Sequence, residues 1–406
     1  MSGRGEPLSQ KQRAELLSTT RARKMARSAH AYVRGNTLKF YEWLDANDRA
    51  NLPEGPPIWI CGDCHLGNLG PVASKEGRVD IQIRDLDQTV IGNPAHDLVR
   101  LGLSLATASR GSDLPGATTA RMIEEMVRGY CEALSGSVSR QTVAERKNKA
   151  VGDVLHQALK RRWKHLARER IKDVRPTIPA TDKFWSLRKG EQAAIQDIVQ
   201  SDAVRGLVTS LKGRSADDKI KLLDAAYWIK GCSSLGRLRY AVLVGVGNNR
   251  EAENGICFLD FKEATKAAAP RSKAVGMPHD YAERVVAGAK ALSPNLGNRM
   301  TAATLADTPV VIRELMPQDL KLEVDSLTSD QAVNVARYLS GVVGHAHARQ
   351  MDKATRQSWR RTVQKVSSNL DAPPWLWKAV VELVASHEAA YLEHCRRYAL
   401  AARHLS

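Results

Sequence analysis

A short glycine-punctuated stretch at residues 59–70, WICGDCHLGNLG, brings an acid, an imidazole and an amide together as Asp63, His65 and Asn68. The next alternation of apolar and polar residues, RVDIQIRDLD, predicts a strand that ends at a further acid, Asp85 or Asp87. Phosphoryl transfer needs a carboxylate to orient the attacking hydroxyl, and oxygen ligands to hold magnesium against the phosphates. We therefore predict that Asp63 is the base and that Asn68 and Asp85 are magnesium ligands.

The same stretch allows other interpretations. Cys61 and Cys64 form a Cys-x-x-Cys pair, but a structural zinc site needs four ligands and the sequence has no second such pair. A redox pair would need a surrounding strand-to-helix pattern, which is missing. Asp and Asn also serve ordinary turns. His65 could act as a base or orient the loop, and Asp87 could be an alternate metal ligand or support one.

The pattern of apolar residues predicts the elements that position these side chains. Helical spacing over 9–48, broken at Gly35, indicates two helices before the loop. The turn Gly92-Asn93-Pro94 should start a helix running from about 95 to 108. We expect further strands at 58–61 and 308–315, and two or three antiparallel strands over 225–264. We expect a helical pattern with basic faces over 115–225, a helix at 279–292, and helices over most of 328–350 and 354–404.

Three motifs in order carry a resemblance to known enzymes. CGDCHLGN, IRDLD and GNPAHDLVRL resemble the His-Gly-Asp-x-His-x-x-Asn, Ile-Asp-x-x-Asp and Gly-Asp-Pro-x-x-Asp-Leu series of the aminoglycoside-phosphotransferase branch of protein-kinase-like enzymes. The resemblance implies that Asp63 is the catalytic aspartate and that Asn68 and Asp85 bind magnesium. It also implies that Asp97 is a buried acid that braces the loop through its backbone. Cys61 stands where that group usually has His.

The larger pattern is similar to the uncharacterised bacterial family DUF2252. The segments KMARSAHAYVRG, GDCHLGNLG and KGCSSLGRLRYAVLV carry this likeness, which covers residues from about 20 to 350. It implies a kinase-like fold and assigns no substrate. Arg34, in YVRG, could steer a phosphate or simply cap a helix end.

A kinase-like small lobe covers the phosphates with a Gly-bearing hairpin, and a Lys on the next strand pairs with the phosphates and with a helix Glu. The segment GCSSLG offers Gly231 and Gly236 for the hairpin. FLDFKEA offers Lys262, and HDYAERVVAG offers Glu283 on the following helix. Each feature alone is also typical of an ordinary hairpin or strand edge.

Kinases place this lobe before the catalytic loop, whereas here it follows the loop. We therefore predict a circular permutation. Folds tolerate such a change when their original termini lie close together at the surface. The prediction requires Lys262 to lie within a few ångströms of the Asp85 carboxylate, or of a nucleotide bridging the two. The expected fold is an α+β, protein-kinase-like two-lobe fold with a mostly helical large lobe and a small antiparallel sheet lobe. The expected domains are 1–225 with the catalytic motifs at 59–101 and the basic helical region at 115–225, 226–325 with the nucleotide-covering β lobe and its helix, and 326–406 with C-terminal helices packing on the large lobe.

Composition limits the class of protein. The chain has 406 residues, of which 43% are hydrophobic and 26% charged, and its formal net charge is +17. Basic residues are densest at 140–175, which could form a solvated helix face, dock an acidic substrate or bind nucleic acid. Six cysteines are scattered, the N-terminus lacks an apolar signal core, and no apolar stretch is long enough to cross a membrane. We expect a soluble cytoplasmic protein.

Together these features predict a phosphotransferase that depends on ATP and magnesium and transfers the γ-phosphate to a hydroxyl of an unidentified small molecule or protein. The basic composition favours an anionic acceptor. One alternative is a nucleotide-binding scaffold without catalysis. Another is a nucleic-acid-binding protein that uses residues 140–175. His345 and His347, in GHAHARQ, are expected to be buried or loop-contacting histidines.

Overall fold

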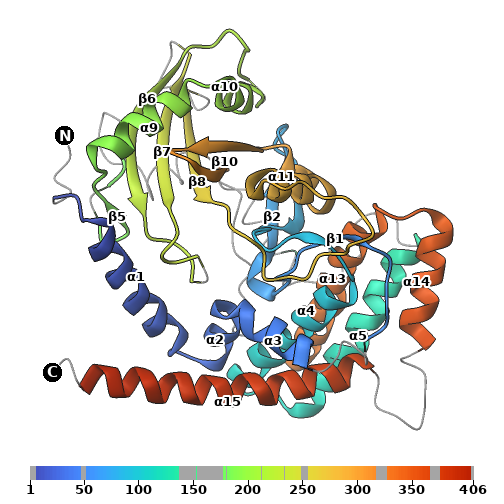
Figure 1. The fold of residues 1–406 in the computed structure, drawn as a ribbon. Coiled ribbons are helices and arrows are strands. Elements are labelled where there is room, and N and C mark those ends of the chain that lie inside the picture. Colours follow the sequence, from blue (N-terminus) through green and yellow to red (C-terminus); the bar gives the residue numbers. More distant parts are fainter. Residues whose placement is uncertain are drawn as a thin grey trace.

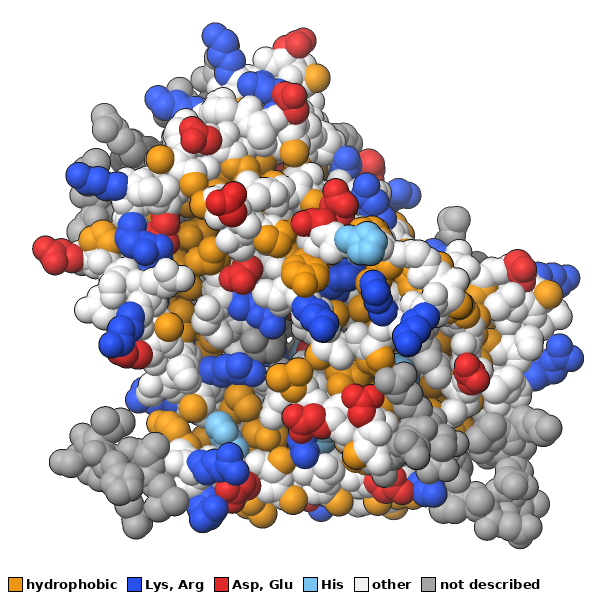
Figure 2. Space-filling view, in the orientation of Figure 1, with side chains coloured by type: hydrophobic (Ala, Val, Ile, Leu, Met, Phe, Trp, Pro, Cys, Tyr) orange, Lys and Arg blue, Asp and Glu red, His pale blue; other side chains and the backbone are white. Residues whose placement is uncertain are grey.

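The computed structural model describes residues 6–46, 52–136, 152, 177–179, 181–211, 213–232, 234–247, 255–316, 327–365 and 375–403. The predicted basic region at 140–175 lies outside these residues except for position 152. None of the described helices combines the length and the apolar character that crossing a membrane requires. On the face drawn in Figure 2, Lys and Arg side chains are interspersed with acidic ones over both parts of the molecule.

An antiparallel sheet of six strands forms one part of the molecule, at the upper left of Figure 1. Its strand order is β5-β6-β7-β8-β10-β9. The strands are β5 (Phe184–Trp185), β6 (Ile220–Trp228), β7 (Arg239–Val246), β8 (Ile256–Glu263), β9 (Met300–Leu305) and β10 (Thr308–Glu314). Of the two or three antiparallel strands expected over 225–264, three are present as β6, β7 and β8, although β6 begins earlier than expected, at Ile220. The strand expected at 308–315 is confirmed as β10. The sequence did not indicate β5, which is very short, or β9, which is mostly half-buried and does not alternate.

Two helices cover one face of this sheet. They are α9 (Lys189–Val199) and α10 (Asp202–Thr209). Ile195 of α9 and Val204 of α10 are fully buried in a cluster with Val242 of β7 and Leu259 of β8. Residue 225, where we expected one domain to give way to the next, lies within β6, and the helices that precede it pack on the sheet.

Helices form the other part of the molecule (Figure 1). They are α1 (Gln10–Met25), α2 (Ala29–Gly35), α3 (Thr37–Ala46), α4 (Ala95–Gly111), α5 (Gly116–Ser135), α13 (Ser329–Ala348), α14 (Lys353–Lys365) and α15 (Trp375–Arg403). The break at Gly35 is confirmed, but the two helices expected over 9–48 are three, because Ser28 caps a separate α2 by accepting from the N–H of Ala31.

The pair α5 and α13 packs closely because glycines remove side chains from the contact. A Cβ on Gly129 would lie 2.1 Å from the carbonyl oxygen of Arg337, and one on Gly344 would lie 2.9 Å from that of Tyr130. The two helices therefore meet nearly backbone to backbone. This close pair supports α4, which lies against it.

Two short pairs of antiparallel strands connect the helices to the sheet. β1 (Ile58–Ile60) pairs with β4 (Val90–Gly92), and β2 (Leu69–Ala73) pairs with β3 (Val79–Ile83). Between β1 and β2 lie residues 61–65 and a single 3-10 turn, η1 (Leu66–Asn68). The strand expected to end at Asp85 or Asp87 ends earlier, at Ile83. The helices α11 (Tyr281–Leu292) and α12 (Pro294–Gly297) lie between these pairs and the large sheet.

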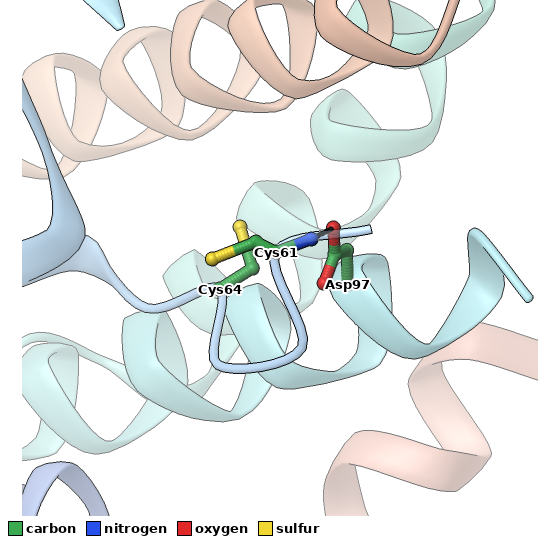
Figure 3. Close-up of side chains that lie close together, drawn as sticks. All are labelled: Cys61, Cys64 and Asp97. Atoms are coloured by element: carbon green, nitrogen blue, oxygen red, sulfur yellow. Dashed lines mark hydrogen bonds between the residues drawn. The ribbon is translucent and has the colours of Figure 1, made fainter. Parts of the chain in front are cut away.

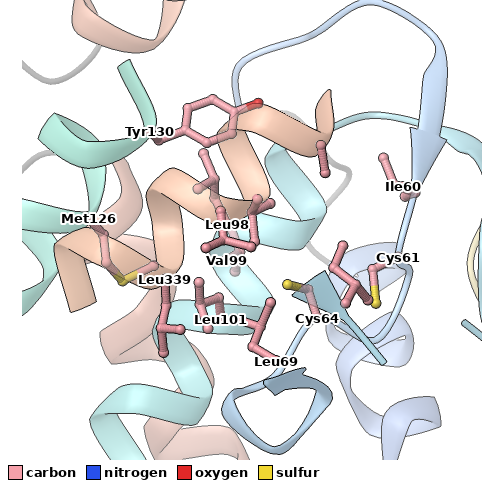
Figure 4. Packing of buried hydrophobic residues seen from close by; sticks show 14 of the residues in the cluster. Ile60, Cys61, Cys64, Leu69, Leu98, Val99, Leu101, Met126, Tyr130 and Leu339 are labelled. Carbon is pink, nitrogen blue, oxygen red and sulfur yellow. The ribbon is translucent and has the colours of Figure 1, made fainter. Parts of the chain in front are cut away.

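The hydrophobic core of the helical part lies directly beneath the loop at 61–65. Figure 4 shows Leu98, Val99 and Leu101 of α4 packed with Met126 of α5 and Leu339 of α13. Cys61 and Cys64 are fully buried in the same core. They act there as small hydrophobic residues that anchor the loop to α4.

Candidate active site

A buried carboxylate braces the loop, as the resemblance implied. Asp97, in the first turn of α4, is fully buried and accepts hydrogen bonds from the backbone N–H groups of Cys61 at 2.7 Å and Gly62 at 2.9 Å. Gly62 has φ +73°, and a Cβ there would lie 2.2 Å from the carbonyl oxygen of Gln88. Only glycine fits this turn.

A chain of side chains extends this brace across the helical part. His347 Nε2 lies 3.1 Å from Asp97 Oδ2, and His347 Nδ1 lies 2.9 Å from the Tyr130 hydroxyl. Trp359 Nε1 donates to the same hydroxyl at 2.9 Å, so Tyr130 donates its proton to Nδ1 and His347 donates from Nε2 to Asp97. The expectation that His347 is a buried histidine is confirmed.

The Cys-x-x-Cys pair also lies against this brace. The sulfur atoms of Cys61 and Cys64 and a carboxylate oxygen of Asp97 lie within 4.8 Å of one another. Figure 3 shows the two sulfurs side by side and the carboxylate of Asp97 facing the backbone nitrogen of Cys61. The hydrogen bond between the thiols and their burial raise the pKa of Cys61, so it stays protonated. A zinc site needs thiolates, and we interpret the cluster as packing.

Asp63 is held in one orientation by two neighbours. Arg100 of α4 donates from Nε to Oδ1 at 2.8 Å, and Thr37 of α3 donates to Oδ2 at 2.8 Å. The Asp63 side chain is only 10% exposed and Arg100 is fully buried. Each carboxylate oxygen retains a second lone pair that can accept from a further hydroxyl.

Asn68 and His65 complete the loop. The Asn68 amide donates from Nδ2 to the backbone carbonyl of Asp63 at 3.0 Å, which leaves its Oδ1 to bind a cation. His65 Nε2 lies 4.0 Å from Asp63 Oδ2, and His65 Nδ1 is buried with no hydrogen-bond partner within the part of the chain that the structure describes. Burial lowers the pKa of His65 to about 3. The ring is therefore neutral near pH 7.

Lys262 joins the large sheet to the loop after β3. Its Nζ lies 3.1 Å from both carboxylate oxygens of Asp85 and also forms an ion pair with Asp87. The expected proximity of Lys262 and Asp85 is thus confirmed. Burial and the charge of Asp85 raise the pKa of Asp87. Burial acts in the same direction on Asp85, but the Lys262 ammonium, the hydrogen bond from Asp87 and the charges of Arg313 and Arg239 together outweigh it and hold the pKa of Asp85 well below its usual range.

A second ion network lies beside Lys262 on the same face of the sheet. Arg239 of β7 stands opposite Lys262 in the register, and it donates from Nε to Asp260 of β8 at 2.8 Å. Arg313 of β10 donates to the same carboxylate at 3.1 Å, and its Nη1 reaches the carbonyl oxygen of Arg84 at 3.1 Å. Asp260 is almost fully buried. The network therefore ties three strands of the sheet to the segment that carries Asp85.

The glycine-bearing hairpin lies between β6 and β7, as predicted. Gly231 and Gly236 have φ of +91° and +101°, so both adopt the left-handed backbone that favours glycine. Lys24 of α1 donates to the carbonyl oxygen of Gly231 at 3.0 Å. The side chain of Cys232 lies close to the end of α2: a Cβ added to Gly35 would lie 2.9 Å from the Cys232 sulfur. The hairpin thus reaches the N-terminal helices.

Glu283 is not brought to Lys262. It is exposed in the first turn of α11, and the ion pairs that the structure describes for Lys262 go to Asp85 and Asp87. The next residue, Arg284, is buried and donates to the carbonyl oxygens of Asp87 and Thr265, each at 2.9 Å. The helix therefore contacts the acidic segment through an arginine.

A separate pocket of about 440 Å³ lies on the other face of the sheet, where Tyr240 and Glu191 contribute to its lining. Tyr240 follows Arg239 in β7 and so points to the face opposite Lys262. Glu191 accepts there from Arg13, with Nη1 at 2.6 Å and Nη2 at 3.1 Å, and also from Arg188 and the Tyr240 hydroxyl. This pocket is distinct from the loop that carries Asp63.

Several residues of the site were not found by sequence reasoning. They are Thr37, Arg100, Arg239, Asp260, Arg284 and Arg313. Arg100 did leave a signal, because it interrupts the apolar run of a helix that is otherwise buried. The others gave no signal, because Thr, Arg and Asp residues are usually exposed at the surface of a protein.

Comparison with known proteins gives a family. The model of a family described as an uncharacterised protein conserved in bacteria, DUF2252, matches residues 13–397. No curated protein and no solved structure matches the chain.

Proposed function

We propose that this chain, which belongs to the DUF2252 family, is a phosphotransferase that uses ATP and magnesium and has a permuted kinase-like arrangement. The observation that carries the proposal is the ion pair of Lys262 with Asp85, which joins β8, the second strand after the glycine-bearing hairpin, to the segment after the Asp63 loop. Kinase-like sites combine such a hairpin, lysine, catalytic Asp and metal-binding acid. The order along the chain is reversed relative to that pattern.

The donor set fits magnesium. Asn68 Oδ1 is left available by the hydrogen bond of its amide nitrogen, and Asp85 and Asp87 supply carboxylates. Hard oxygen ligands of this kind are those that magnesium prefers. The Lys262 ammonium now lies between the two carboxylates, so this place already accommodates a positive charge. Magnesium, when bound, would neutralise charge on the nucleotide phosphates.

The chain's own residues then have distinct tasks. Asp63 accepts a hydrogen bond from the acceptor hydroxyl and takes its proton as the new oxygen–phosphorus bond forms. The bond between the γ-phosphorus and the bridging oxygen breaks, and its electron pair leaves with ADP. Lys262 exchanges its carboxylate partners for phosphate oxygens, and Gly231 and Gly236 let the hairpin backbone approach them. Asp97 keeps the loop in place through its backbone.

A nucleotide-binding scaffold without catalysis is the second candidate, and the ion pair of Asp63 with Arg100 favours it. A carboxylate that already has two donors is a weaker acceptor for a third. Binding of nucleotide with no hydrolysis and no transfer would support this candidate.

The test combines binding with a search for a product. Calorimetry should detect binding of magnesium and ATP to the full chain, and incubation with γ-labelled ATP and a bacterial metabolite extract should yield a labelled product. Asp63→Asn should remove the product and retain nucleotide binding. Asp217→Asn, at an exposed position, serves as the matched control. A wild-type protein that binds no nucleotide would refute both candidates.

A further inference from the structure

Arg34, one residue before the end of α2, has no hydrogen-bond or ion-pair partner among the described residues. Its Nε is buried. A buried N–H group without an acceptor costs about 1–3 kcal/mol. An arginine in this state is stabilised when an anion supplies the missing acceptor, and planar guanidinium groups suit phosphate oxygens in particular.

The Arg34 guanidinium lies against the backbone of the candidate catalytic loop. A Cβ on Gly67 would lie 2.8 Å from Arg34 Nη2 and 3.0 Å from Nε. Gly67 therefore provides the flat surface on which the guanidinium rests, between Asp63 and Asn68 in sequence. Its φ is not in the left-handed region, so the need for glycine here is spatial.

Arg34 also faces the glycine-bearing hairpin. Burial lowers the pKa of His65 in the loop and raises the pKa of Cys232 in the hairpin, and the charge of Arg34 is near enough to both groups to exert a smaller lowering effect on each. The neighbouring Gly35 lies close to the sulfur of Cys232. The guanidinium thus lies where the loop and the hairpin approach each other.

We propose that Arg34 binds the transferred phosphoryl group and acts as an arginine finger supplied within the chain. This inference rests on the proposed function and adds a catalytic residue to it. As the acceptor oxygen bonds to the γ-phosphorus and the bond to ADP breaks, negative charge is spread over the three remaining phosphoryl oxygens. Arg34 donates to these oxygens, and its buried N–H gains an acceptor.

The test compares ATP with ADP on the full chain. Calorimetry in magnesium should give tighter binding of a non-hydrolysable ATP analogue than of ADP to the wild type. Arg34→Gln should bind the two ligands with the same affinity and leave the ADP affinity unchanged. With water as acceptor, the rate of ATP hydrolysis by Arg34→Gln should fall by about 10³-fold or more, which is the size of effect that an arginine finger has on turnover.

Two further variants separate this role from a structural one. Gly67→Ala retains the arginine but places a methyl group against its guanidinium, so it should lose part of the preference for the ATP analogue. Arg27→Gln removes the same charge from an exposed site seven residues earlier and should behave as wild type. Equal loss of ADP and ATP affinity in Arg34→Gln, or no loss of either, would overturn the role of Arg34 alone. Absence of nucleotide binding to the wild type would overturn the proposed function as well.

Discussion

Lys262 Nζ lies 3.1 Å from both carboxylate oxygens of Asp85, although 177 residues separate the two in sequence. Asp87 shares the same ammonium group. The arrangement concentrates two carboxylates and one cation at the boundary between the large sheet and the loop. The single ammonium group therefore offsets the repulsion between the two carboxylates.

Removing Lys262 should make stability depend on magnesium. In Lys262→Met, the Asp85 and Asp87 carboxylates repel each other without a cation between them, so the melting temperature should fall in metal-free buffer. Added magnesium chloride should restore most of the loss, whereas it should change the wild type less. Thermal unfolding with and without magnesium measures both. Lys290→Met, at an exposed position of α11, is the control. An identical magnesium response in all three proteins would contradict the assigned metal site.

Asp63→Asn should cost stability as well as activity. The change leaves Arg100 buried without its counter-charge, and breaking a buried ion pair typically costs about 3–5 kcal/mol. Asp63→Asn combined with Arg100→Met should recover part of the free energy of unfolding and none of the phosphoryl transfer. Denaturant unfolding of the two single variants and the double variant gives the coupling energy. Additive losses would mean that the pair contributes no coupling.

Magnesium binding should weaken on acidification earlier than an ordinary aspartate would cause. The pKa of Asp87 is raised by burial and by the charge of Asp85, so Asp87 takes up a proton at a higher pH than a free aspartate. A protonated carboxyl is a poor magnesium ligand, and the apparent affinity therefore falls as the pH falls through this raised value. Calorimetric titration with magnesium between neutral and acidic pH measures the midpoint. In Asp87→Asn this pH dependence of magnesium affinity should disappear. A midpoint in the wild type at the pKa of a free aspartate would contradict the role of Asp87 as a magnesium ligand.

The buried chain from Trp359 to Asp97 should affect turnover at a distance. Tyr130→Phe removes the hydroxyl that connects Trp359 to His347, and it should lower the free energy of unfolding by about 1 kcal/mol. The His347 ring, which is the partner of Asp97, is then held less firmly. The loop that Asp97 braces should therefore position Asp63 less well. We expect a lower turnover number with an unchanged ADP affinity. Thr118→Val, which removes a hydroxyl from the same helix at its contact with Ser329, controls for the loss of a hydrogen bond alone.

Local sequence was sufficient for the turn that starts α4 and for the glycine and asparagine positions of the loop. The brace from Asp97 to the backbone of Gly62, 35 residues away, was expected only from the resemblance to kinase-like enzymes. The extent of the sheet was less predictable. β9 carries little hydrophobic alternation, because four consecutive residues of it are half-buried, and pairing with β10 decides its conformation.

The types and spacing of residues determined which side chains could do phosphoryl chemistry, since a chain segment of a few residues fixes its own turns and caps. Only the tertiary structure decided the other charge contacts: Asp87 instead of Glu283 as the second partner of Lys262, Arg100 with Asp63, and Arg34 with no protein partner at all among the described residues. The physical reason is that a buried charge is satisfied by whatever packing brings within about 3–4 Å of it. That proximity results from contacts between segments far apart in sequence, which local patterns do not encode.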